Sequence, residues 1–176
     1  MGASPDYADA ARALGRELVT RELILVYGGG NIGLMGVLAD AVLEAGGEVI
    51  GVMPQHLIER ELAHDGLSRL EVVGDMLERK ARMAALSDAF IALPGGYGTL
   101  DELFEMLTWT QIGTQLKPCG VLNVAGYYDA LLAWVAHAVR EGLVRPGHAK
   151  LLLAETDAGE LLNALASWSF QEIPLV

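Results

Sequence analysis

The sequence predicts an α/β fold: a doubly wound sheet of parallel strands in one domain. Short apolar runs rich in β-branched residues alternate with amphipathic segments of helical length, and this alternation is typical of parallel sheets. The length of 176 residues suits one domain with a substantial core. Glycine runs follow two of the apolar runs, and ligands of such sheets bind at the carboxyl ends of the strands.

Each expected strand is an apolar run, and each expected helix is a segment whose apolar residues recur at helical spacing. The strands are expected at residues 23–27, 48–53, 69–73, 89–93, 118–123 and 151–154. The helices are expected at residues 7–20, 34–45, 76–86, 99–112, 127–141 and 157–168. The glycine runs follow the first and the fourth of these strands, so a ligand site is expected at that edge of the sheet.

The composition limits where this protein works and what it binds. Its single cysteine, Cys119, excludes an internal disulfide and fits the reducing cytoplasm, and its place in an expected strand predicts a packing role. No apolar stretch approaches the roughly 18 residues of a membrane span, and residues 1–6 lack the features of a secretory signal. The net charge of −11 argues against a broad nucleic-acid surface, so a local site must hold any anionic ligand.

The most informative segment is residues 94–102, which joins an expected strand to an expected helix. Its sequence is Pro-Gly-Gly-Tyr-Gly-Thr-Leu-Asp-Glu, in which three glycines let the backbone approach a ligand and direct N–H groups at it. A helix that begins at Thr99 adds the positive end of its dipole. The segment therefore predicts a phosphate cradle with a carboxylate, Glu102, three residues after Thr99.

The same residues have a purely structural explanation. Thr99 and Glu102 match a capping box, in which Thr99 caps the helix and the Glu102 side chain reaches back to it. For single residues the two explanations are evenly matched. The glycines favour the cradle, because an ordinary turn from strand to helix seldom needs three of them in four positions.

The other glycine run follows the first expected strand. Residues 28–33 match G-x-G-x-x-G, the pattern of dinucleotide sites. The acidic residue that such sites carry about 20 residues later is absent, because the next strand ends in Gly-Val-Met-Pro at residues 51–54. A phosphate-binding turn at Gly28, Gly29 and Gly30, or close packing of helix on strand, explains the run better than a site for NAD.

A cation interrupts an apolar stripe on the helix expected at residues 76–86. Met76, Arg79 and Met83 share one face at helical spacing, whereas Glu78 and Arg82 form an i,i+4 pair expected to face solvent. A guanidinium directed inward requires an anionic partner or a ligand. The structural alternative is that Arg79 extends out of the stripe to reach water.

Residues 94–102 match the signature P-G-G-x-G-T-x-x-E, and residues 76–80 match M-x-x-R-K. Together they resemble the "lonely guy" (LOG) family of cytokinin riboside 5′-monophosphate phosphoribohydrolases, many of which were once labelled lysine decarboxylases. Further similar segments lie at residues 26–36, 51–54 and 87–93, and the similarity runs from about residue 2 to about residue 144.

The resemblance implies a Rossmann-like fold and hydrolysis of the N-glycosidic bond of an adenosine-type monophosphate, which yields free base and ribose 5-phosphate. It implies that Arg79 and Glu102 are the catalytic pair and that no cofactor is needed. Substrate-binding residues implied by the match are Glu61, Arg79, Lys80, Gly95, Gly96, Tyr97, Gly98, Thr99, Leu100, Asp101, Glu102 and Thr108. Taken alone, Glu61 reads as a solvated loop charge, so its assignment depends on the resemblance.

The resemblance also implies a homodimer. A chain that is 52% hydrophobic, with a mean hydropathy of +0.34, has more apolar surface than one small domain easily hides. The helices that carry Arg79 and Thr99 are the expected interface, with Met106 and Trp109 as candidate anchors.

The beginning of the chain departs from the family. Members begin with an apolar strand and a Cys-Gly-Ser-type turn that contributes to the phosphate site. Here residues 2–4 are Gly-Ala-Ser, similar to the end of that turn, and the strand is missing from the single domain expected over residues 1–176. Because the first strand of a doubly wound sheet lies centrally, its neighbours should lack a partner. Either the start is set too late, or the sheet closes in another way.

Three other functions are weighed. A nucleotide- or cofactor-binding module on the same fold, similar to molybdenum-cofactor carriers, needs the cradle but not both Arg79 and Glu102. A lysine decarboxylase needs a lysine that forms a Schiff base, and none of the chain's lysines has such a setting. A broader purine nucleoside 5′-monophosphate nucleosidase is the closest competitor. The histidines show no metal-ligand spacing, so no metal site is expected.

Overall fold

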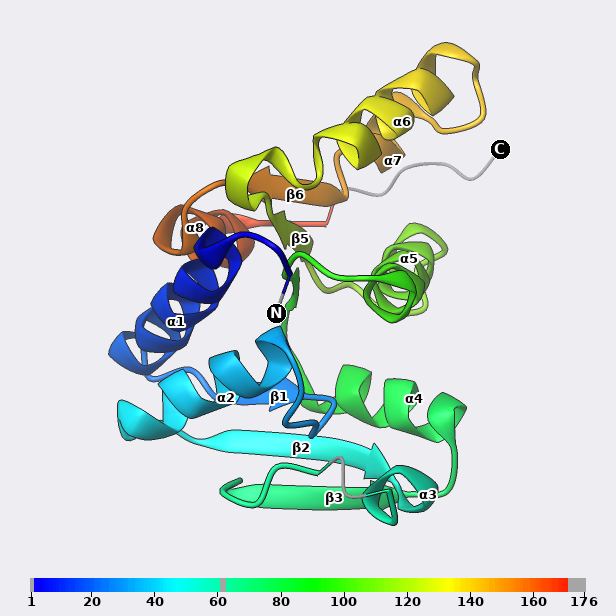
Figure 1. Cartoon of the computed structure of the whole chain (residues 1–176). Helices are drawn as coiled ribbons and strands as arrows, with labels where there is room; N and C mark the ends of the chain where they lie inside the picture. Colours follow the sequence, from blue (N-terminus) through cyan, green and yellow to red (C-terminus); the bar gives the residue numbers. More distant parts are fainter. Residues whose placement is uncertain (1, 61–62, 171–176) are drawn as a thin grey trace. The chain divides into compact units, whose positions relative to one another are not determined.

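The computed structural model describes residues 2–60 and 63–170 (Figure 1). Its contacts divide the chain into two compact units, Met1–Ser87 and Asp88–Val176, which are described separately. Each unit is built on a three-stranded sheet whose strands are parallel. Within the described residues, no helix is long and apolar enough to cross a bilayer.

The elements of the first unit alternate in type. They are α1 (Pro5–Thr20), β1 (Leu25–Tyr27), α2 (Leu34–Glu44), β2 (Val49–Pro54), α3 (Gln55–Ile58), β3 (Arg69–Val73) and α4 (Met76–Leu86). The order of the strands in the sheet is β1-β2-β3. All six residues of β2 are buried, as the continuous apolar run of a central parallel strand predicts. Figure 1 shows α1 on α2, and a β-carbon on Gly15 would lie 2.8 Å from that of Ala41, so the two helices meet closely there.

The second unit repeats this plan. Its elements are β4 (Phe90–Ala92), α5 (Tyr97–Gln111), β5 (Cys119–Leu122), the 3₁₀ turn η1 (Val124–Gly126), α6 (Asp129–Arg140), α7 (Pro146–Ala149), β6 (Leu152–Glu155) and α8 (Ala158–Ser167). The order of the strands is β4-β5-β6. Figure 1 shows α5 and α8 on opposite sides of β5, which is buried throughout. A β-carbon on Gly120 would lie 2.7 Å from Leu161 of α8, so the glycine lets that helix approach the strand.

The prediction of an α/β fold with parallel strands is confirmed, but the described strands form two sheets and not one. Among the described residues, β1 pairs only with β2, and β4 pairs only with β5. In the part of the chain that the structure describes, the outer strands β1, β3, β4 and β6 each have one unpaired edge. The ends of the elements differ from expectation by a few residues, and α3, α7 and η1 were not predicted.

The start of α4 corrects the expected pair of Glu78 with Arg82. Asp75 is the N-cap of α4 and accepts a hydrogen bond from the Glu78 amide, while the Glu78 carboxylate accepts one from the Gly74 amide at 2.6 Å. This arrangement resembles a capping box, with Asp75 in the place of the usual serine or threonine and the return bond made to the amide of Gly74, the residue before the N-cap. The sequence pattern Asp-x-x-Glu at residues 75–78 carried the signal for it.

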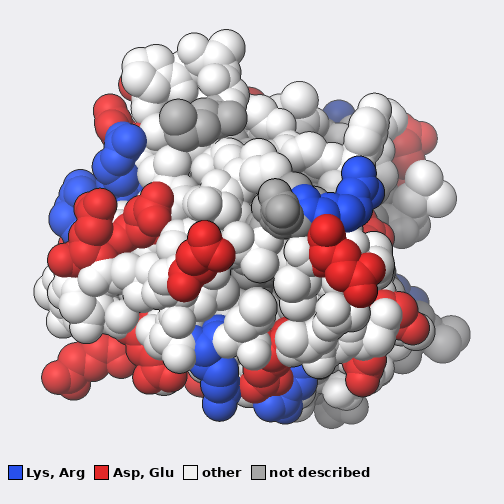
Figure 2. Space-filling model, turned by 60° about the horizontal axis from the view of Figure 1, so that its bottom comes forward, with Lys and Arg blue, Asp and Glu red and all other residues white. Residues whose placement is uncertain are grey.

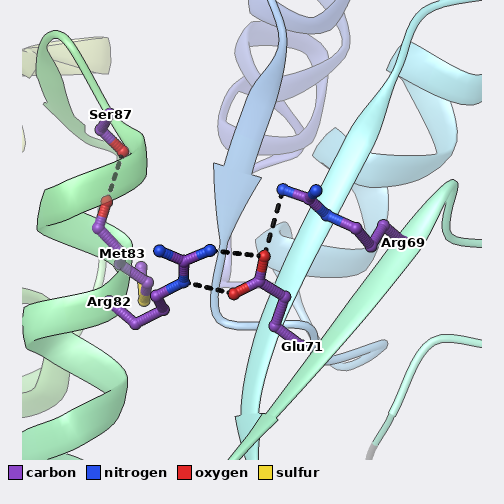
Figure 3. Close-up of polar contacts among 5 residues, drawn as sticks. All are labelled: Arg69, Glu71, Arg82, Met83 and Ser87. Carbon is purple, nitrogen blue, oxygen red and sulfur yellow. Dashed lines mark hydrogen bonds and ion pairs between the residues drawn. The ribbon is translucent and has the colours of Figure 1, made fainter.

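Arg82 instead joins α4 to β3 (Figure 3). Its Nη2 donates to a carboxylate oxygen of Glu71 at 3.0 Å, its Nε donates to the other oxygen, and Arg69 approaches Glu71 at 3.1 Å. The hydrogen bonds from Arg82 hold the pKa of Glu71 below its usual range. The helix that carries Arg79 is thus tied to the edge of its own sheet.

The surface seen in Figure 2 carries acidic and basic side chains side by side. Acidic residues exceed basic ones in the chain, 23 against 12. A broad basic patch of the kind that holds a nucleic-acid backbone is not seen on this face of the described residues.

Candidate active site

The glycine loop after β4 leads directly into α5. Gly96 is the N-cap of α5, and its carbonyl accepts the first helical hydrogen bond, from the Leu100 amide at 3.1 Å. The four amides without an acceptor inside the helix are therefore those of residues 96–99. They lie at the positive end of a 15-residue helix, where an anion is favoured.

The glycines of this loop serve two purposes. A β-carbon on Gly95 would overlap the hydroxyl of Thr99, so Gly95 makes room for that side chain. A β-carbon on Gly96 or Gly98 would meet nothing within 4 Å, and neither residue has the positive φ that demands glycine. The fold does not require glycine at these two positions. Because glycine has no side chain, both positions leave open space beside the amides that have no helical acceptor.

The expected capping box at Thr99 and Glu102 is wrong. The helix begins at Tyr97, so Thr99 lies in its first turn and its side chain contacts Gly95. Glu102 lies in the second turn, half-buried, on the helix face that Gly98 and Thr99 occupy one turn earlier. Because the N-cap is Gly96 and not Thr99, the capping-box explanation of Glu102 loses its main support.

An open groove of about 560 Å³ runs along the same helix. Its lining residues recur at helical spacing and are Tyr97, Leu100, Asp101, Phe104, Glu105, Thr108 and Trp109. Thr108 lies nine residues after Thr99, about 13 Å along the helix axis, and its hydroxyl donates to the Phe104 carbonyl at 2.7 Å. The expected substrate-binding residues Tyr97, Leu100, Asp101 and Thr108 therefore share one surface of the second unit.

Of the two orientations that the apolar stripe left open for Arg79, the structure shows the inward one, within the first unit. Its Nε donates to the carbonyl of Val52 in β2 at 3.1 Å, and its Nη1 lies 3.7 Å from the sulfur of Met76. A β-carbon on Gly28, the residue after β1, would overlap Nη2 of Arg79. The guanidinium thus lies at the carboxyl ends of β1 and β2, where a parallel sheet binds its ligands.

Close packing accounts for the first glycine run. Gly28, Gly29 and Gly30 are buried, and Gly28 provides the space that Arg79 fills. Gly29 has a φ of +78°, and a β-carbon there would lie 3.5 Å from the backbone of Gly51 in β2. The backbone of Gly30 forms an isolated antiparallel bridge with Ala63. Of the two explanations offered for this run, the structure supports packing.

The predicted site residues fall into two groups. Arg79 and the half-buried Lys80 lie together on α4 of the first unit, and residues 95–102 with Thr108 lie on the loop and helix of the second. Glu61 lies outside the described residues.

Two tyrosines beside the glycine loop were missed by sequence analysis, which placed them in a helix. The hydroxyl of Tyr127 donates to the Gly95 carbonyl at 2.6 Å, and that of Tyr128 donates to the Leu93 carbonyl at 2.5 Å. Both follow β5, which is parallel to β4 and adjacent to it. That position was the available signal, because loops after neighbouring parallel strands meet at one edge of the sheet.

Cys119 has the packing role that its sequence position predicts. It is 1% exposed in β5, and burial raises the pKa of its thiol to about 12. A thiol with so high a pKa supplies almost no nucleophilic thiolate at neutral pH.

Comparison with known proteins places this chain in a family. A family model described as "Possible lysine decarboxylase" matches residues 35–165. A probable cytokinin riboside 5′-monophosphate phosphoribohydrolase of Oryza sativa subsp. japonica is 50% identical over 167 residues, which are 95% of this chain and 74% of the relative. A cytokinin riboside 5′-monophosphate phosphoribohydrolase of Arabidopsis thaliana is 49% identical over 168 residues, 96% of this chain and 78% of the relative.

The chain belongs to the LOG family. The identification on the two motifs is thereby confirmed, and "Possible lysine decarboxylase" is the description that the family model still carries.

Solved structures extend the fold beyond the LOG family. A molybdenum-cofactor-binding protein of Rippkaea orientalis matches 94% of this chain and 89% of its own, with a TM-score of 0.70 and 23% identity. The molybdenum cofactor carrier protein of Chlamydomonas reinhardtii matches 93% and 88%, with a TM-score of 0.69 and 22% identity. At such identities the likeness concerns the fold alone, and it confirms a single-domain, Rossmann-like α/β architecture.

Proposed function

We propose that this chain hydrolyses the N-glycosidic bond of cytokinin riboside 5′-monophosphates, which are N6-substituted derivatives of AMP, or of AMP itself. The products are the free base and ribose 5-phosphate. About half of the residues are identical to those of relatives named for this activity, over nearly the whole of this chain. The alternative is a broader purine nucleoside 5′-monophosphate nucleosidase.

The observation that carries the proposal is the open start of α5. Four amides without a helical acceptor, at residues 96–99, face space that no side chain of Gly96 or Gly98 fills. A 5′-phosphate bound there accepts hydrogen bonds from backbone amides and is favoured by the helix dipole. A non-enzymatic carrier also needs such a cradle, but it has no use for a carboxylate one turn further along the helix.

The proposed chemistry assigns Glu102 to the reacting centre. Cleavage of a bond between ribose and nitrogen develops positive charge on the sugar, as other glycoside cleavages do. A carboxylate beside the sugar stabilises that charge or activates the attacking water. With the phosphate fixed at residues 96–99, the sugar is held near the second turn of α5, where Glu102 lies.

Arg79 is the second proposed catalytic residue, and Lys80 is a proposed substrate-binding residue beside it on α4. Nε of Arg79 donates to the Val52 carbonyl, which fixes the plane of the guanidinium at the carboxyl ends of β1 and β2, and there we propose that the guanidinium orients an anionic group. Pairing with a carboxylate and pairing with the phosphate are both compatible with this geometry. The substrate contact proposed for Glu61 rests on the resemblance alone.

The test of the reaction is a panel of substrates followed by chromatography of the products. The protein is incubated with AMP, isopentenyladenosine monophosphate, GMP and CMP, and separately with lysine and added pyridoxal phosphate. Free adenine-type base together with ribose 5-phosphate supports the proposal, and comparable release of guanine supports the broader nucleosidase. Carbon dioxide from lysine, without base release, contradicts both.

Ligand protection tests the phosphate cradle by itself. AMP and ribose 5-phosphate are expected to raise the midpoint of thermal unfolding, because a ligand that binds only the folded state stabilises it by mass action. Adenosine, which lacks the phosphate, should protect far less. Equal protection by AMP and adenosine would mean that the glycines only turn the chain.

Gly98→Ala should separate stability from binding. Residue 98 lies in the first turn of α5 without a positive φ, so alanine should stabilise the fold by about 0.5–1 kcal/mol. The added methyl group intrudes on the anion site and should weaken the binding of ribose 5-phosphate about tenfold. The measurements are denaturant unfolding and calorimetric titration.

Gly113→Ala is a matched control for glycine replacement outside the cradle. Gly113 has a φ of +76°, so alanine there should lower stability while leaving ribose 5-phosphate binding unchanged. A Gly98→Ala protein that binds the ligand as tightly as wild type contradicts the cradle.

We also propose that the protein is a homodimer. The groove face of α5 supports this, because it presents Leu100, Phe104 and Trp109 beside Tyr97, which is 95% exposed. Met106 was the other expected anchor, but it is 5% exposed, so its side chain is not presented at the surface. Sedimentation at micromolar concentration should give twice the mass of the 18.8 kDa chain, and a monomer would contradict the proposal.

The compartment we propose is the cytoplasm. Its reducing conditions suit a chain whose single cysteine is a buried free thiol.

A further inference from the structure

The loop between β5 and α6 is a rigid support for two tyrosines. Its backbone turns sharply at Ala125 and Gly126, which have φ values of +49° and +72°. The side chain of Asn123 then braces the turn: its Oδ1 accepts from the Tyr128 amide at 2.7 Å, and its Nδ2 donates to Asp129 at 2.8 Å. The left-handed backbone and these hydrogen bonds fix where the two tyrosines leave the chain.

The two rings support each other and differ in exposure. Tyr127 and Tyr128 pack edge to face, with centroids 5.0 Å apart and planes at 89°. Tyr128 is 2% exposed, whereas Tyr127 is 42% exposed. Each hydroxyl donates to a carbonyl of the segment that enters the glycine loop, at Leu93 for Tyr128 and at Gly95 for Tyr127.

The two hydrogen bonds have different consequences for the cradle. In a trans peptide the carbonyl of one residue and the N–H of the next point in opposite directions. The bond from Tyr127 to the Gly95 carbonyl therefore directs the Gly96 N–H away from the tyrosine. The bond from Tyr128 to Leu93 orients no N–H, because the next residue is Pro94.

We propose that Tyr127 is a positioning residue for the phosphate cradle: it fixes the Gly95–Gly96 peptide so that the Gly96 N–H is presented to the phosphate of the substrate. Gly96 needs such support because it has no side chain and no neighbour within 4 Å of its β position, so packing does not hold this peptide plane. Gly96 also precedes the regular helix, whose hydrogen bonds would otherwise fix its amide. The inference rests on the proposed phosphate site at residues 96–99.

Tyr127→Phe tests the inference, with Tyr128→Phe as the matched control. Each variant loses one hydroxyl from the same loop and keeps its ring and the edge-to-face contact. For Tyr127→Phe, the dissociation constant for ribose 5-phosphate and the KM for AMP should rise about tenfold, while kcat changes little. Adenosine affinity should stay at the wild-type value, because adenosine has no phosphate. Tyr128→Phe should lower the unfolding midpoint, because the Leu93 carbonyl loses the hydroxyl that donates to it. It should leave the affinity for ribose 5-phosphate unchanged.

A second measurement separates positioning from a general loss of structure. In wild type, the amide resonance of Gly96 should shift when ribose 5-phosphate is added, and in Tyr127→Phe that shift should shrink while those of Gly98 and Thr99 persist. Wild-type affinity in Tyr127→Phe, or an equal loss of affinity in Tyr128→Phe, overturns the positioning role. Failure of wild-type protein to bind ribose 5-phosphate would instead overturn the phosphate site on which the inference rests.

Discussion

Glu102→Gln is expected to lower the kcat of nucleotide hydrolysis by at least about 10³-fold, within the range that a positioned acid or base contributes. The amide has the size of the carboxylate but carries no negative charge, so it can neither stabilise a cationic sugar nor activate water. Binding of AMP should survive, because the phosphate is held by the backbone of residues 96–99. Stability should change little, because the N-cap of α5 is Gly96 and glutamine keeps the size of the glutamate and one of its acceptor oxygens.

Glu160→Gln is the control for this substitution. Glu160 is an exposed carboxylate in the first turn of α8, outside the glycine loop and the groove, so its replacement removes the same charge from the chain. Its turnover per folded molecule should remain near that of wild type. The measurement is single-turnover kinetics at saturating AMP, together with an unfolding curve for each variant. A Glu102→Gln protein that is less stable but turns over normally would support a structural role for Glu102.

Arg79→Lys should lower kcat/KM about 10²-fold or more, comparable to the loss of a donor that stabilises developing charge. Arg79 uses Nε on the Val52 carbonyl while its terminal nitrogens lie beside Gly28 and Met76. A lysine ammonium cannot donate to Val52 and present a planar fork of donors at the same time. The Val52 carbonyl also loses its donor, so a modest loss of stability should accompany the loss of activity.

The matched control is Arg82→Lys, three residues further along α4. Arg82 faces Glu71 at the surface, and an ammonium can keep that ion pair in a solvated setting. Steady-state kinetics should therefore show near wild-type activity for Arg82→Lys and a large loss for Arg79→Lys. Equal activities would mean that Arg79 supplies only a charge and that its fork of donors is not used.

Much of the fold could be predicted because a buried strand or helix face requires apolar residues in a local pattern that the sequence shows directly. A central parallel strand must be apolar on both faces, and β2 and β5 are continuous apolar runs that are fully buried. Where helices begin was harder to predict, because several residues compete for the cap. Thr99 is a better capping residue than Gly96, yet α5 begins at Tyr97, and the Thr99 side chain lies beside Gly95 in the first turn.

The candidate site, like the fold, could be predicted only in part from the sequence. The sequence identified residues 94–102 because an ordinary turn from strand to helix seldom needs three glycines. It identified Arg79 because a cation is unusual within an apolar stripe of a helix. It could not assign Glu78 to the Gly74 amide or Arg82 to Glu71, because helical spacing offered the simpler pair of Glu78 with Arg82.

By itself, the sequence determined the parallel α/β fold, the family, and the loop and helix that carry the proposed chemistry. These depend on patterns within single segments: apolar runs, helical spacing, and the two motifs at residues 76–80 and 94–102. Only the tertiary structure showed that Gly95 makes room for Thr99 while Gly96 and Gly98 leave open space, and that Tyr127 holds the Gly95 carbonyl. The reason is physical: the space beside a glycine and the donor to a carbonyl are set by segments that folding brings together, and here 32 positions separate the donor from its acceptor.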